Sequence, residues 1–336
     1  MTNDYATRID FRHAMVANLY STPFHTLPEC FEELLALPRE ELINDLEKLL
    51  RHEIKFMTDN DPENDEVADA VIHSLRLLGH LKSERSLPLI LDVFRLPAAQ
   101  SDIWLGDLPT EDLWDIPVLC GMNQLEALVQ LIKDVSLEDK YSKSILTETI
   151  EQVAHYNPEK QPEVVQHLTH LLHFFNALSD KAFAKHLGAE FVVASIADAA
   201  ANLSITEILP VVEDLFGKGR IDPIFRGDWI EYQKVFGDTY NSRSVVYDDA
   251  RNWYDTRGEM WKGIQQRNLE EQLKYEKEKL KKEQAAAQEA LRRAKQENLF
   301  QVTGGKKSAE TSLVPVVAGK SLKNVMGREG GFLRSV

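Results

Sequence analysis

Apolar residues recur along most of the chain at the spacing of amphipathic helices. Leu87, Ile90, Leu91 and Phe94 occupy positions i, i+3, i+4 and i+7, and the stretch 125–132 repeats this spacing. Such spacing places the apolar side chains on one face of a helix. No run alternates apolar and polar residues for long enough to indicate a strand. The pattern therefore predicts an all-α fold.

The ends of the expected helices are marked by turn-forming residues. Pro38 opens a helical stretch with acids behind it, at a first-turn position where its missing N–H costs no hydrogen bond. Residues 59–65, 156–162 and 217–223 are rich in Gly, Pro, Asn and Asp, and they separate the helical stretches. The chain is therefore expected to be a series of helices joined by short turns.

One short stretch occurs twice: LPLILDVF at 87–94 returns as LPVVEDLF at 209–216. Two further helical stretches start between them, at 125 and 162, so that successive starts lie roughly 36 to 48 residues apart, the span of a HEAT-like helix pair. One such pair cannot bury its apolar face alone and stacks on its neighbours. We expect a HEAT-like α-solenoid of paired helices; an irregular bundle with chance similarity is the alternative.

The two copies differ at one informative position. Glu213 stands where the first copy has Leu91. The last repeat of a solenoid needs a more polar outer face than an internal repeat. We therefore predict that Leu91 is buried and that Glu213 is exposed or paired.

Composition divides the chain into four expected regions. These are an N-terminal extension (1–27), the HEAT-like α-solenoid (28–260), a long charged helix (261–300) and a basic tail (301–336). The tail holds glycines among scattered lysines and arginines and supplies little that could pack. We expect it to be disordered when the chain is alone.

The charged helix is rich in strong helix formers and has a thin apolar seam. Glu276 and Glu283 interrupt the a and d positions that a coiled coil would need. We therefore favour a solvated single helix that docks along one edge. A strong coiled coil is the alternative. The seam consists of Leu269, Leu273, Leu280, Ala287 and Leu291.

Charge is distributed unevenly along the sequence. Residues 261–336 carry 16 Lys and Arg against 9 acids, whereas residues 1–260 carry 23 against 45. A body this acidic repels a phosphate backbone, so nucleic-acid binding by the body is disfavoured. We expect a non-enzymatic interaction scaffold that binds a protein or peptide, of basic character, on an acidic solenoid surface. The basic tail would dock on the body or contact a second partner; binding to anionic membrane or RNA is the other alternative for the tail.

The two cysteines, Cys30 and Cys120, cannot form a disulfide framework or a four-ligand zinc site. They suit a reducing compartment, in which they act as small apolar residues. The first twenty residues hold acids and arginines where a signal peptide needs an apolar core. We expect a cytoplasmic protein with no membrane span and no cofactor.

An acidic, tryptophan-bearing stretch is the best candidate site. Asp107, Glu111 and Asp115 lie at i, i+4 and i+8, with Asp112 and Trp114 between them. Carboxylates on one side of a helix beside an aromatic ring could bind a basic peptide or a divalent ion. We predict these five residues as partner-binding. The alternative function is a metal-dependent hydrolase that uses the same carboxylates.

The same acids also have a structural interpretation. Thr110 is a good N-cap, and acids in the first turn behind it suit the helix dipole. Pro117 should bend or end this helix within two turns. A short helix is a poor platform for precise catalysis, which disfavours the hydrolase.

The histidines give weaker signals. His167, His170 and His173 are spaced i, i+3 and i+6, which turns them away from the apolar face, so His170 and His173 should face solvent without a metal. The pair His52–Glu53 resembles the His-Glu pairs with which HEAT-repeat metal hydroxylases hold two irons. Because such enzymes need several pairs and this chain has one, that function is disfavoured.

Two loop motifs lack residues that their functions require. The stretch 59–66 begins like a calcium loop, but Asn64 and Ala70 occupy the places of the glycine and of the bidentate glutamate. The stretch TGGKKS at 303–308 has adjacent glycines and no preceding strand, so it is not a phosphate loop. We interpret them as an inter-helix turn and a basic tail.

A resemblance to a known family rests on the acidic stretch and on a later glycine-rich turn. With these residues the chain resembles, over about residues 36–236, an uncharacterised bacterial family of HEAT-like proteins, domain-of-unknown-function family eleven-eighty-six. The resemblance implies an α-solenoid body without assigning a function. Members often end in a cysteine-rich zinc-binding tail, and this chain departs from that pattern because no cysteine follows Cys120. The residues that carry the resemblance are Gly106, Asp107, Thr110, Glu111, Asp112, Leu113 and the region 219–223.

Overall fold

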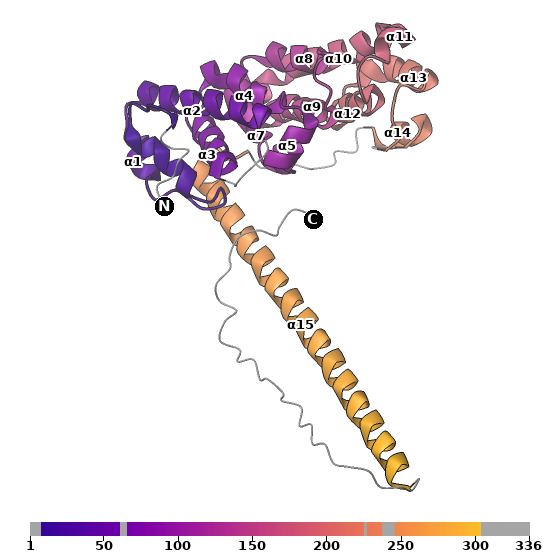
Figure 1. The fold of residues 1–336 in the computed structure, drawn as a ribbon. Coiled ribbons are helices and arrows are strands. Elements are labelled where there is room, and N and C mark those ends of the chain that lie inside the picture. Colours follow the sequence, from indigo (N-terminus) through magenta and orange to yellow (C-terminus); the bar gives the residue numbers. More distant parts are fainter. Residues whose placement is uncertain (1–7, 61–65, 225–226, 237–245, 304–336) are drawn as a thin grey trace. The chain divides into compact units, whose positions relative to one another are not determined.

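The computed structural model (Figure 1) describes residues 8–60, 66–224, 227–236 and 246–303. In these ranges the regular secondary structure consists of helices, without strands. This confirms the predicted all-α, solenoid-like fold class. The chain divides into two compact units, Met1–Gln266 and Arg267–Val336. We call the first unit the body.

The helices follow one another with short connections. The α-helices are α1 Phe31–Leu35, α2 Arg39–Asp59, α3 Glu66–His80, α4 Leu87–Phe94, α5 Ala98–Trp104, α6 Leu108–Glu111, α7 Asp115–Gly121, α8 Leu125–Lys133, α9 Lys140–Tyr156, α10 Gln161–Ala177, α11 Asp180–Phe183, α12 Ala189–Asn202, α13 Leu209–Gly217, α14 Trp229–Val235 and α15 Ala250–Thr303. The 3₁₀ helices are η2 Ala14–Ser21, η3 Glu84–Ser86, η4 Pro158–Lys160 and η5 Thr206–Ile208.

Two layers of helices form the body. In the first layer α3 contacts α7, α7 contacts α9 and α9 contacts α12. In the second layer, α2 contacts α4, and α10 contacts both α8 and α13 (Figure 1). Contacts such as those of α2 with α3 and of α9 with α10 join the layers. Each amphipathic helix thus buries its apolar face against both the other layer and its neighbour, as a solenoid requires.

The repeated sequence coincides with a repeated joint between helices. Lys82 and Ser204, 122 positions apart in the numbering, both have a left-handed backbone, with φ 48° and 55°. After each of them an amide bonds five residues back, Ser83 to the Leu78 carbonyl at 3.1 Å and Ile205 to the Ala200 carbonyl at 3.0 Å, as in a Schellman motif. A 3₁₀ turn, η3 or η5, then leads into a helix with proline in its first turn. The same local structure therefore begins both copies.

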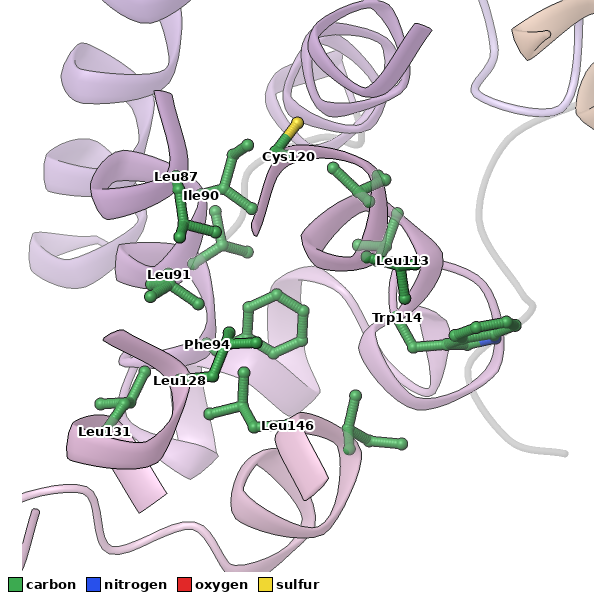
Figure 2. Close-up of a cluster of buried hydrophobic side chains, with 14 of the residues drawn as sticks. Leu87, Ile90, Leu91, Phe94, Leu113, Trp114, Cys120, Leu128, Leu131 and Leu146 are labelled. Carbon is green, nitrogen blue, oxygen red and sulfur yellow. The ribbon is translucent and has the colours of Figure 1, made fainter. Parts of the chain in front are cut away.

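Burial confirms the predicted difference between the copies. Leu91 is 2% exposed, whereas Glu213 is exposed. Phe94 belongs to the same core cluster as Leu128 of α8 and Leu146 of α9 (Figure 2). The first copy is therefore internal to the stack, and the second turns a polar side chain to solvent.

The first layer is covered on both sides over much of its length. Every residue of α7 is buried, and in α3 the described run from Val67 to Gly79 is buried except for Asp69. The covering elements are η2, which contacts α3, and α6, which contacts α9. The beginning of α15 contributes as well, through Tyr254 against His73 of α3. Within the described ranges, α7 consequently presents no open inner face to a partner.

Helix α15 covers the predicted charged segment 261–300 and begins earlier, at Ala250. In the second unit its seam leucines are exposed; Leu269 is 57% and Leu280 54% exposed. No helix among the described residues is both long and apolar enough to cross a membrane. Residues 304–336, nearly all of the predicted tail, lie outside the described ranges.

Candidate functional site

The acidic stretch of the sequence forms a corner between two short helices. Asp107 precedes α6, Glu111 is its last residue, and Asp115 is the first residue of α7. Because the helix is interrupted between Glu111 and Asp115, the three carboxylates do not share one helical face. The expectation of a single face was wrong: the amide of Leu113 turns back to the Leu108 carbonyl at 3.0 Å, which closes α6 after one turn.

The predicted N-cap was also misplaced. Thr110 lies inside α6, and its hydroxyl donates to the Asp107 carbonyl at 2.8 Å. Its side chain therefore bonds back towards the start of the helix instead of capping an amide. Pro117 is the third residue of α7, where a proline leaves no intrahelical bond unmade. Pro117 therefore lies in the first turn of a new helix, α7, whereas the sequence predicted that it would bend or end a helix.

The five predicted partner-binding residues differ strongly in exposure. Asp107 and Glu111 are exposed, and Asp112 is partly buried. Trp114 is 8% exposed and Asp115 only 1%. The structure thus leaves two of the five, Asp107 and Glu111, exposed to solvent.

Asp115 is held by a buried arginine of α3. Arg76 Nη1 donates to both Asp115 oxygens, at 2.8 and 2.9 Å, and the Tyr247 amide donates to Oδ2 at 3.2 Å. The Arg76 guanidinium also lies 4.2 Å from the ring centroid of Trp253. Burial raises the pKa of Asp115, and Arg76 acts against this rise. The pair, which is 2% and 1% exposed, is a closed ionic contact.

A second arginine binds the same corner from α15. Arg257 forms an ion pair with Asp112, and its Nη2 lies 3.6 Å from Glu111 Oε2. The Arg257 side chain is 12% exposed, so its charge is largely removed from water. The corner therefore binds a guanidinium that belongs to the same chain.

Two histidines of α3 extend this attachment. His73 Nδ1 lies 2.6 Å from the Tyr254 hydroxyl, and its Nε2 lies 2.9 Å from the Thr22 carbonyl. Because a carbonyl can only accept, Nε2 carries the proton and Nδ1 accepts from Tyr254. Burial lowers the pKa of His73 to about 4, so the ring is neutral at pH 7. Further along α3, seven residues after His73, His80 Nδ1 accepts from the Ala250 amide at 3.3 Å.

These contacts define an anchor segment, residues 246–261, which lies on α3, α6 and α7. Its outer edge is fixed by Arg251, whose Nε and Nη2 each donate to a Glu32 oxygen at 2.8 Å. At its end the Trp261 ring lies 4.7 Å from the ring of His25. Arg76, Asp115, His73 and Tyr254 have almost no contact with solvent. The arrangement can hold the anchor segment in place, but a dissolved substrate does not reach it.

A different polar group lies on α2, where the sequence offered one His-Glu pair. His52 Nδ1 lies 2.9 Å from Glu53 Oε1, and the Tyr20 hydroxyl donates to the same oxygen at 2.5 Å. Glu53 and Tyr20 are buried, while the His52 side chain is 38% exposed. Tyr20 lies 33 positions away in the chain, so no local pattern indicates that it completes this group.

The two histidines that were predicted to face solvent do so. His170 and His173 are exposed on α10, and His167 is partly buried near Glu126 and Glu163. Within the described ranges, no three His, Cys, Asp or Glu side chains come together as a metal site would require. Residues 61–65 of the calcium-like stretch and 304–308 of TGGKKS lie outside those ranges.

Both cysteines have free thiols and are buried. Burial raises the pKa of the Cys120 thiol to about 12, and that of Cys30 is raised for the same reason. Reactive cysteines need a stabilised thiolate. These two residues therefore contribute apolar volume to the core.

Comparison with known proteins yields one match. The model of a family described as a protein of unknown function, DUF1186, matches residues 25–228, which is more than half of the chain. No curated protein and no solved structure matches the chain.

Proposed function

We propose that this chain, which belongs to the DUF1186 family, is a non-enzymatic scaffold that binds a basic protein or peptide on the acidic surface of its body. Met1–Gln266 carries 24 lysines and arginines against 45 aspartates and glutamates. Such an excess of negative charge attracts cationic partners and repels nucleic acid.

The single observation that carries the proposal is the binding of Arg257 at the α6–α7 corner. Asp112 and Glu111 bind this guanidinium within the chain. Glu111 remains 63% exposed while it does so, and Asp107 is exposed beside it. Arginine is favoured in such contacts because its planar donors fit carboxylates. The outer carboxylates of the corner are therefore available to a basic side chain of a partner.

The second unit supports an interaction role independently. Helix α15 continues to Thr303 and exposes 45% of Leu273 and 59% of Leu291 in addition to the leucines given above. A row of exposed leucines on a charged helix suits docking against another helix. We propose this seam as a second contact.

The cytoplasm is the proposed location. Two buried, unpaired cysteines fit a reducing compartment. An acidic surface that interacts with basic proteins is also compatible with that environment.

The test removes charge from the corner and from a matched pair elsewhere. Affinity capture from the native cells, with mass spectrometry, identifies the partner, and titration then compares wild type with Asp107→Asn/Glu111→Gln. Since exposed ion pairs contribute about 0.2–1 kcal/mol each, we expect a several-fold weaker Kd that is also less sensitive to salt.

The control variant is Glu138→Gln/Glu213→Gln, which removes the same charge from two exposed sites outside the corner. It should bind as wild type does. Equal weakening in both variants would show that net charge alone, and not the corner, attracts the partner. Unchanged binding in both would contradict the proposed surface.

A further inference from the structure

The His52–Glu53–Tyr20 group combines a buried carboxylate with a solvent-facing imidazole. Glu53 is 0% and Tyr20 1% exposed. His52, on α2, keeps 38% of its side chain exposed. Since Nδ1 is engaged with the buried Glu53, Nε2 is the ring nitrogen left to face solvent.

The Glu53 carboxylate, as an acceptor, fixes the tautomer of this imidazole. Burial and the neighbouring Glu53 raise the pKa of Tyr20 well above its ordinary value, so its hydroxyl keeps the proton and donates to Glu53. The Glu53 oxygen that receives it accepts from His52 Nδ1 as well. A carboxylate behind a histidine in this way holds the ring orientation and leaves a lone pair on the far nitrogen. Nε2 is therefore presented as a nucleophile.

Cations flank the ring on the exposed side of α2. Lys48 and Lys55 lie at i−4 and i+3 from His52, the positions that neighbour it on a helix, and Arg51 precedes it. All three are exposed, and Lys48 Nζ also donates to the Asp10 carbonyl. Among the described residues neither Arg51 nor Lys55 has an ion-pair partner. In a body with nearly twice as many acids as bases, this is a local basic stripe that fits an incoming phosphate.

We propose that His52 is a phosphoryl-accepting histidine, loaded by an acyl phosphate on Nε2. The Nε2 lone pair attacks the phosphorus, the N–P bond forms, and the P–O bond to the acyl oxygen breaks. The donor leaves as a free carboxylate, which takes the electron pair of that bond. The Nδ1 proton stays in its hydrogen bond to Glu53, which balances the positive charge that develops on the ring. Lys48 and Lys55 contact the transferring oxygens, while Glu53 and Tyr20 are positioning residues.

The experiment exposes the full chain to acetyl phosphate and follows the intact mass over time. We expect addition of one phosphoryl group that is stable in base and labile in acid, as an N–P bond is. Peptide mapping should place it on His52, and the phosphorus NMR shift should identify the Nε2 isomer. His170 and His173 serve as internal controls, because both are exposed histidines of the same chain without a buried carboxylate behind them.

His52 should react about tenfold to a hundredfold faster than either control, the range in which a carboxylate behind a functional histidine acts in metal sites. Glu53→Gln should remove most of this advantage and change the pH profile of labelling, whereas Glu53→Asp should restore part of it. Lys48→Gln/Lys55→Gln should slow labelling, and Lys181→Gln/Lys185→Gln, at two exposed lysines of another region, should not. Circular dichroism confirms that each variant is folded.

Labelling of His52 no faster than of His170 and His173 would overturn the proposal, because the rate would then be that of any exposed imidazole. A folded Glu53→Gln variant that is labelled like wild type would overturn it too. Neither result bears on the acidic corner, whose charges lie on α6 and α7.

Discussion

Two buried carboxylates in the body bond to partners that differ in exposure to solvent. Asp115 is 1% exposed and Glu53 0%, so burial alone does not separate them. Asp115 bonds to Arg76, which is itself 2% exposed and carries a permanent charge. Glu53 bonds to a neutral hydroxyl and to a histidine whose ring reaches the surface.

The difference shows that the partner decides the role of a buried acid. An ion pair in which both side chains are buried has no group free to bind a ligand. Removing one partner is costly because the remaining buried charge is left without compensation. A carboxylate behind a partly exposed imidazole passes its orienting effect to an atom that solutes reach. Asp115 therefore fixes the anchor segment, and Glu53 supports a surface group.

The largest expected effect follows from neutralising Asp115. Asp115→Asn keeps the shape of the side chain but leaves Arg76 buried and uncompensated, so the free energy of unfolding should fall by about 3–5 kcal/mol. Urea unfolding monitored by circular dichroism measures this loss. Limited proteolysis should show earlier cleavage in the anchor segment, since Asn keeps only one of the two acceptor oxygens that Arg76 and the Tyr247 amide share.

The double variant Arg76→Met/Asp115→Leu is the control for this prediction. Replacing both charges by apolar side chains of similar size removes the uncompensated charge, so it should be more stable than the single variant. A single variant within about 1 kcal/mol of wild type, in the range of exposed ion pairs, would contradict the role of Asp115 as an anchor.

The next effect is a dependence of stability on pH through His73. Its pKa is lowered from 6.5 to about 4 in the folded chain. Between these values the unfolded chain binds the proton and the folded chain does not, so stability is fully present above pH 6.5 and is lost as pH falls towards 4. A shift of this size corresponds to about 3 kcal/mol at most. Unfolding midpoints at pH 7 and pH 5 measure it.

His73→Asn should flatten part of this pH dependence, whereas the exposed His170→Asn should not. Burial also lowers the pKa values of His25 and His80, which therefore add in the same direction. If His73→Asn retained the full wild-type slope, the buried hydrogen bond to Tyr254 would not control acid stability.

The sequence alone was sufficient to predict the stacked helices and the polar position in the second copy. Leu91 is buried and Glu213 is exposed, as predicted, because burial of each depends on the face of its own helix. Helical periodicity is local, and the turn that starts each copy is encoded within a few residues of it. These features require no knowledge of distant contacts.

The two polar groups could not be predicted because both depend on distant residues. Asp115 bonds to Arg76 across 39 positions and to Tyr247 across 132, and Glu53 meets Tyr20 across 33. A signal was present: Arg76 interrupts the apolar run of α3, and a charge on a buried face requires a partner. The sequence shows that Arg76 needs a partner but not which acid supplies it, so the sequence alone places Asp115 among the partner-binding residues.

The smallest expected effect tests whether Glu53 is an anchor in the manner of Asp115. Tyr20→Phe removes one hydroxyl and leaves Glu53 bonded to His52. The loss of one neutral donor to a charged acceptor should cost about 1.5–3 kcal/mol, less than the loss of the buried ion pair. Urea unfolding measures it, with Tyr141→Phe at a 53% exposed ring as the control. A loss as large as that of Asp115→Asn would mean that Glu53 also serves mainly to hold the fold together, and the contrast between the two carboxylates would disappear.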